Sequence, residues 1–95
     1  MSDIITKAVE ALSARIDHFD GSAKFVIRDI GAIMVNQNGV YAGDEAADVT
    51  LTADLEVFRA LIEGNLKPMS AFMSGKLVLD GPMGVAMKLG SAMAS

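Results

Sequence analysis

The stretch that decides the fold runs from Asp48 to Lys88 and reads DVTLTADLEVFRALIEGNLKPMSAFMSGKLVLDGPMGVAMK. Its spacing predicts a short strand, a helix, a second short helix, another strand and a final helix. The apolar face of the first helix is formed by Leu55, Phe58, Leu61 and Ile62. The stretch therefore predicts two helices that cross between two strands of a sheet.

Residues with known capping preferences mark the ends of these helices. Thr52 is expected to cap the first helix, because its hydroxyl can accept a hydrogen bond from a free amide of the first turn. Gly64 suits the left-handed conformation that often ends a helix. Pro68 suits the first position of the second helix, where its missing amide has no helical partner. Gly75 is expected to end that helix, and Lys76–Leu79 alternates like a strand with one better buried face.

The rest of the chain predicts one more helix and the remaining strands. Apolar residues recur at helical spacing from about Asp3 to Ile16. Alternation over Ser22–Asp29 predicts a half-buried strand. The continuously apolar Ala32–Asn36 predicts a strand covered on both faces, and Asn38-Gly39 predicts a hairpin to Val40–Ala42. Within the opening stretch, the strands are Val49–Thr52 and Lys76–Leu79, and the final helix runs from about Pro82 to Ala92.

An ordered set of short motifs links this stretch to a known family. The motifs are Asp48-Val49-Thr50-Leu51-Thr52, Phe58 with Leu61, Glu63-Gly64-Asn65-Leu66-Lys67-Pro68, Ala71-Phe72-Met73-Ser74-Gly75-Lys76-Leu77, Asp80-Gly81 and Met87-Lys88-Leu89. In this order and at this spacing, they resemble the sterol carrier protein 2 (SCP2) sterol-binding domain, a lipid-carrier family. The first half of the chain matches only as a helix followed by short strands.

The fold expected from these observations is α+β, since helices and strands segregate along the chain. The resemblance implies a five-stranded, mostly antiparallel sheet in the order 3-2-1-4-5, with helices covering one face. It also implies an apolar tunnel between the sheet and the helices. Residues 1–95 are then expected to form a single SCP2-like lipid-binding domain.

The resemblance implies non-covalent binding and carriage of an apolar lipid, such as a fatty acid, a fatty acyl-CoA or a sterol-like molecule. Each buried methylene would contribute about 0.8 kcal/mol. The expected lining residues from the crossover helices are Phe58, Leu61, Ile62, Phe72 and Met73. The expected wall or lid consists of Met83, Met87 and Leu89, and the expected sheet floor of Ile33, Val35, Leu77 and Leu79. Each of these residues also fits an ordinary core position.

A second hypothesis comes from the final helix, which is apolar over a broad face and has Lys88 as its one charged residue. Such a helix must pack against the domain, a ligand or another subunit. The chain also contains seven methionines, whose flexible side chains suit adaptable interfaces as well as variable ligands. The alternative function is therefore an interaction module, with a homodimer formed through the C-terminal helix and no functional lipid cavity.

Composition excludes several other classes of function. The net charge of −4 argues against nucleic-acid binding and against strong attraction to anionic headgroups. The absence of cysteine excludes thiol catalysis and zinc–thiolate sites. His18 is the only histidine and has no evident catalytic partner, so we expect no enzyme activity and no cofactor. The acidic Gly43–Asp48 stretch lacks the alternating ligands of a calcium loop, so we expect a solvated loop and no metal site.

The location of the protein is expected to be cytoplasmic. The chain begins without the cationic and apolar regions of a signal peptide. Its last residues, Ala92-Met93-Ala94-Ser95, are not a Ser-Lys-Leu peroxisomal signal. Its apolar runs are far shorter than the roughly 20 residues that cross a bilayer, so it is not expected to be membrane-embedded.

Overall fold

Helices and strands succeed one another along most of the chain. The computed structural model describes residues 3–16 and 19–94, with the backbone alone at residues 68 and 90–94. The elements are α1 Asp3–Arg15, β1 Ser22–Ile27, β2 Gly31–Asn36, β3 Gly39–Ala42, β4 Val49–Ala53, α2 Leu55–Glu63, α3 Pro68–Met73, β5 Val78–Asp80 and α4 Met83–Ala94. The fold is therefore α+β, as the sequence predicts.

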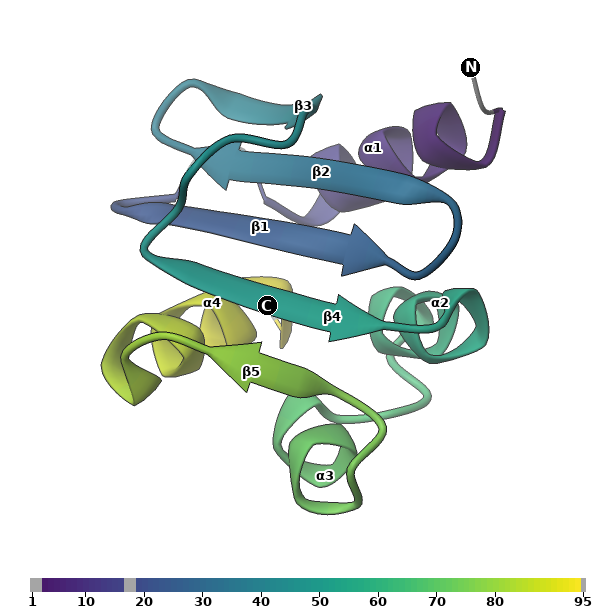
Figure 1. Ribbon diagram of the computed structural model, residues 1–95, viewed down its shortest axis with the longest axis vertical. Coiled ribbons are helices and arrows are strands. Elements are labelled where there is room, and N and C mark those ends of the chain that lie inside the picture. Colours follow the sequence, from purple (N-terminus) through teal and green to yellow (C-terminus); the bar gives the residue numbers. More distant parts are fainter. Residues whose placement is uncertain (1–2, 17–18, 95) are drawn as a thin grey trace.

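The strands form one sheet in the order β3-β2-β1-β4-β5, which confirms the expected topology (Figure 1). β1 pairs with β4 in parallel, from Ala23 opposite Val49 to Ile27 opposite Ala53. The β1–β2, β2–β3 and β4–β5 pairs are antiparallel, so the sheet is mixed but mostly antiparallel. A parallel pair needs a long connection, and here β2, β3 and the following loop provide it.

α1 and α4 lie behind the sheet in the view of Figure 1, and Phe58 of α2 packs against Phe25 of β1, which confirms that helices cover one face. α3 lies beyond the β5 edge. Burial in β1 follows this arrangement, because Ala23, Phe25 and Ile27 are buried while the residues between them are half-buried. The contiguous core consists of Ala8, Leu12, Ile16, Phe19, Ala23, Phe25, Ile27, Ile33, Val35, Val49, Leu51, Ala53, Phe58, Leu61, Ala71, Leu77 and Leu89. The sheet and the helices thus share one apolar core.

The opposite face of the sheet is crossed by the loop of residues 43–48, which joins β3 to β4 (Figure 1). Asp44 pairs with the Lys24 ammonium at 2.8 Å, and the Tyr41 hydroxyl donates to Glu45 at 3.1 Å. Met34 is opposite Lys24 and Tyr41 in the strand register, so it lies on this face, yet it is only 1% exposed. β2 is therefore buried on both faces, as its continuous apolar run predicts.

The predicted cap at Thr52 is wrong. Thr52 lies within β4, opposite Val26 and Val78, and the strand continues to Ala53 before α2 begins at Leu55. Asp54 therefore occupies the capping position in an extended conformation, but its side chain makes no capping hydrogen bond. Its carboxylate accepts a hydrogen bond from the Arg28 guanidinium at 3.0 Å instead. Parallel pairing with β1 prolongs the strand past the residue that local preference favours as a cap.

The other helix boundaries predicted from glycine and proline are confirmed. Gly64 follows α2 in the left-handed region at φ 82°, and its neighbours Asn65 and Leu66 donate to the Ala60 carbonyl. Pro68 begins α3. Gly75 has φ 80° and lies just past the end of α3.

Several boundaries differ from the prediction, among them the end of β1 at Ile27 and the bounds of α4. At two places local hydrogen bonds explain the difference. β5 begins at Val78 rather than Lys76, since the amides of Lys76 and Leu77 donate to the Ala71 carbonyl and close α3. The β2–β3 hairpin is confirmed, but its loop is one residue earlier, because Asn36 pairs with Gly39. The Asn38 amide donates to the Asn36 side chain at 2.9 Å, which fixes this turn.

Candidate functional site

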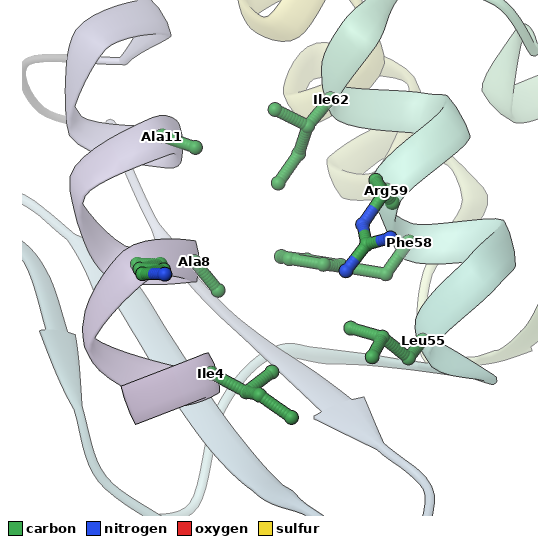
Figure 2. A pocket seen from close by; sticks show the side chains of 8 residues that line it. Ile4, Ala8, Ala11, Leu55, Phe58, Arg59 and Ile62 are labelled. Carbon is green, nitrogen blue, oxygen red and sulfur yellow. The ribbon is translucent and has the colours of Figure 1, made fainter. Parts of the chain in front are cut away.

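A groove of about 280 Å³ lies between α1 and α2 (Figure 2). The side chains that line it are Ile4, Lys7, Ala8, Ala11, Leu55, Phe58, Arg59 and Ile62. These positions recur at intervals of three and four on each helix, so each helix presents one face to the groove. The groove is therefore a product of two helix faces that meet without filling the space between them.

The groove exists because α1 carries small residues where α2 carries large ones. Ala8 and Ala11 are three positions apart and point toward α2 (Figure 2). Across from them, Leu55, Phe58 and Ile62 extend from α2. The short alanine side chains leave open the volume that a leucine or isoleucine would occupy. This combination of small and large side chains is what a chain-like apolar ligand would complement.

Phe58 lines the groove although it is only 2% exposed. The ring also contacts Phe25 of β1 in an edge-to-face arrangement, with centroids 5.5 Å apart. One side of Phe58 thus belongs to the groove and the other to the core above the sheet.

Two cationic side chains, Lys7 and Arg59, line the otherwise apolar groove. Both are solvent-exposed, and no ion pair or hydrogen bond is recorded for either within the described residues. Figure 2 shows Arg59 on α2 among the apolar side chains that line the groove. The groove therefore combines an apolar lining with positive charge, an arrangement suited to an apolar chain with an anionic end.

The twelve predicted lining residues fall into three groups. Six are buried in the core, namely Ile33, Val35, Phe58, Leu61, Leu77 and Leu89. Ile62 and Leu79 are partly buried against it. Phe72, Met73, Met83 and Met87 are exposed. Of the twelve, the groove brings together Phe58 and Ile62.

The apolar pattern of the sequence predicted no lining role for α1. The lining residues outside that prediction are Ile4, Lys7, Ala8 and Ala11 of α1, together with Leu55 and Arg59 of α2. One feature of the sequence could have indicated the groove: Ala8 and Ala11 lie three residues apart next to the apolar stripe of α1. Small residues that face a large apolar helix face can indicate unfilled space.

The described residues hold neither a metal-binding cluster nor a membrane-spanning helix. Within residues 3–16 and 19–94, no group of three or more His, Asp or Glu side chains is placed to hold a metal ion. In the same part of the chain, no helix has both the length and the apolar character needed to cross a membrane. His18, for which we expected no catalytic role, lies outside the described residues.

Several known proteins are similar to this chain in sequence, among them one from Danio rerio and one from Homo sapiens. Hydroxysteroid dehydrogenase-like protein 2 from Danio rerio is 52% identical over 48 residues, which is 50% of this chain and 12% of that protein. Sterol carrier protein 2 from Homo sapiens is 50% identical over 46 residues, which is 48% of this chain and 8% of that protein. The matched part of this chain thus spans about a tenth of the length of these relatives.

Several solved structures share the fold, among them two from Aedes aegypti. Sterol carrier protein 2 like 2 from Aedes aegypti superposes with a TM-score of 0.77 at 25% identity, covering 93% of this chain and 94% of that chain. Sterol carrier protein 2 from Aedes aegypti, solved in complex with palmitate, superposes with a TM-score of 0.72 at 20% identity. That match covers 99% of this chain and 97% of the other.

The family assignment rests on a match that extends over almost the whole chain. The model of the SCP-2 sterol transfer family matches residues 3–94, from the first described residue of α1 to the last of α4. This chain belongs to the SCP-2 sterol transfer family.

Proposed function

We propose that the protein binds an apolar lipid non-covalently in the groove between α1 and α2 and carries it through water. The observation that supports this proposal is the groove itself, in which apolar side chains of two helices face each other across unfilled space. Membership of the SCP-2 sterol transfer family supports the same function. Binding of this kind needs no catalytic group, because the transfer of apolar surface out of water drives it.

The size of the groove favours a slender ligand that enters by one end. Its volume of about 280 Å³ is close to the lower limit of about 300 Å³ for small-molecule sites. We propose that a longer chain continues past Phe58 into the layer between the sheet and the helices. Opening this layer would bring Leu61, Ile33 and Val35 into contact with the ligand and create the tunnel that the resemblance implies.

A fatty acid is the ligand class that the charges favour. Lys7 and Arg59 provide cationic donors for a carboxylate, and charge-assisted hydrogen bonds are about twice as strong as neutral ones. The related carrier from Aedes aegypti was solved with palmitate, a C16 fatty acid. A sterol offers only a hydroxyl at its polar end, so it would use these two cations less well.

The proposal is tested by measuring palmitate affinity while filling the groove from α1. Ala11→Leu places three extra carbon atoms in the groove and should weaken palmitate binding at least tenfold in isothermal titration calorimetry. Ala14→Leu is the matched control, because Ala14 is exposed on the same helix and does not line the groove. Equal affinities for the wild type and Ala11→Leu, with the fold intact by circular dichroism, would refute the proposed site.

A further inference from the structure

Methionine and leucine occupy different places in this fold. The chain contains eight leucines, all of which are buried or half-buried. Of the five methionines whose side chains the structure describes, one is buried and four are exposed, namely Met69 at 46%, Met73 at 78%, Met83 at 41% and Met87 at 55%. The two residue types are similar in volume and in apolar character, so size does not explain the division. What methionine adds is a thioether sulfur.

The exposed methionines form two pairs, each spaced by about one helical turn. Met69 and Met73 lie four residues apart on α3, and Met83 and Met87 lie four residues apart on α4. Residues at this spacing share a face of their helix. None of the four lines the groove between α1 and α2 or belongs to the core. Four thioethers are therefore open to water at positions where a change of side chain disturbs neither the core nor the groove.

The fifth described methionine, Met34, has the opposite environment, because it is only 1% exposed. A Cβ built at Gly43 would lie 3.2 Å from the Met34 Cγ, so the start of the loop of residues 43–48 lies against this side chain. The Gly43 amide donates to the Ala32 carbonyl at 3.2 Å and holds the loop there. A sulfoxide oxygen on Met34 would be a polar group buried in this packed site, so oxidation there should destabilise the fold.

We propose that Met69, Met73, Met83 and Met87 are sites of reversible oxidation that remove peroxides and thereby keep Met34 reduced. A lone pair of the thioether sulfur attacks one oxygen of hydrogen peroxide, so that an S–O bond forms and the O–O bond breaks. The sulfur is oxidised by two electrons, and the departing hydroxide takes the proton of the transferred hydroxyl and leaves as water. Methionine sulfoxide reductases reverse the change. The chain contains no cysteine, so no thiol of its own competes for the peroxide.

The test supplies a limited amount of oxidant, four equivalents of hydrogen peroxide per protein, and locates the sulfoxides by tandem mass spectrometry. Cleavage after glutamate separates Met34, which lies between Glu10 and Glu45, from the methionines that follow Glu63. In the wild type, Met73 should be oxidised at least about tenfold faster than Met34, because its sulfur is open to water. The melting temperature should stay unchanged while Met34 remains reduced.

The decisive variant replaces every exposed methionine of the described residues by leucine: Met69→Leu, Met73→Leu, Met83→Leu, Met87→Leu. These changes conserve volume at exposed positions, so the variant should fold like the wild type. With the same amount of peroxide, the oxidised fraction of Met34 should rise at least about threefold, since fewer sulfurs compete for the oxidant. The melting temperature of the oxidised variant should then fall by about 4 °C or more.

The matched control is the double variant Phe72→Leu, Val78→Leu. It alters exposed apolar side chains in the same part of the chain and removes no sulfur. Met34 should therefore be protected in it as well as in the wild type. Met1 and Met93 are present in all three proteins, and their sulfoxides are measured separately.

Equal oxidation of Met34 in the wild type and in the leucine variant would overturn the proposal, as would oxidation of Met34 as fast as that of Met73. A wild-type protein that unfolds when its exposed methionines alone are oxidised would also overturn it, because protective sites must tolerate the sulfoxide. None of these measurements uses a lipid, so their outcome is independent of the proposed lipid site.

Discussion

The rings of Phe25 and Phe58 meet at 5.5 Å between centroids with their planes inclined by 69°. This contact joins the central strand β1 to α2, the helix that forms one wall of the groove. Edge-to-face pairs of this kind contribute beyond the area that they bury. The contact therefore couples the stability of the core to the shape of the groove.

A double-mutant cycle measures this coupling. Phe25→Leu and Phe58→Leu should each lower the free energy of unfolding, and the two losses should differ from additivity by about 0.5–1.5 kcal/mol. Urea unfolding followed by circular dichroism gives the four values. Phe25→Leu combined with Phe72→Leu is the control pair, because Phe72 is exposed and has no aromatic partner recorded in the described residues. Additive losses for Phe25 and Phe58 would contradict the prediction.

Gly81 fixes the approach of the turn after β5 to the start of β4. Its φ is 135°, and a Cβ there would lie 2.5 Å from the Asp48 carbonyl oxygen. At Gly75, where φ is 80°, a Cβ would meet no atom within 4 Å. Gly75→Ala should therefore cost about 1–2 kcal/mol of stability from backbone strain alone. Gly81→Ala should cost about 1–3 kcal/mol more, because the backbone must also move.

The two glycine variants are compared by their midpoints in thermal and urea unfolding. The comparison is internally controlled, since each variant adds one methyl group at a residue with positive φ. Equal destabilisation would mean that the contact at Asp48 relaxes without cost, contrary to the prediction.

Met34 shows that the face of the sheet opposite to the helices has a packed site of its own. Met34→Ala should lower the free energy of unfolding by about 2–5 kcal/mol, because the side chain is 1% exposed. Met73→Ala should change it by less than about 0.5 kcal/mol, since that side chain is 78% exposed. A small loss at Met34 would show that the loop of residues 43–48 does not remain over the sheet in solution.

The contribution of the ligand's polar end to binding can be measured separately from that of its apolar chain by comparing two ligands that differ only in the polar end. Arg59→Gln should weaken palmitate binding about fivefold and leave hexadecanol binding unchanged, if the guanidinium contacts a carboxylate. This prediction rests on the proposed lipid site. Arg28→Gln controls for the loss of one charge elsewhere. Equal weakening of both ligands would indicate that Arg59 supports the groove by packing and not by charge.

The helices and strands could be predicted because their signals are local. The alternation around Phe25, the glycine at residue 64 and the proline at residue 68 each determine the backbone of their own segment. The strand order came from the resemblance to a family, since no local pattern states that Ala23 pairs with Val49. The cap predicted at Thr52 was wrong because Thr52 pairs with Val26, 26 residues earlier in the chain, and this pairing outweighs its local preference for a capping position.

The groove could not be predicted from the apolar pattern. Leu77 and Ile62 both have the character of a buried residue, yet one is a core residue and the other lines the groove. What separates them is the space left between two helices, which depends on Ala8 and Ala11 of a distant segment. The exposure of Met73 and Met87 could not be predicted either, because the sequence does not show which apolar helix face remains uncovered.

The parallel pairing of β1 with β4 also has a consequence for biosynthesis. Residues 23–27 of β1 each pair with the residue 26 positions further along the chain, so that edge of β1 stays unpaired until β4 has been made. At about 5–20 residues per second, the wait is roughly 1–5 seconds on the ribosome. An open strand edge is a site of aggregation. The nascent chain is therefore prone to aggregation during this interval, whereas the folded protein is not, because β4 then covers the edge. A chaperone that protects the chain would act during the same interval.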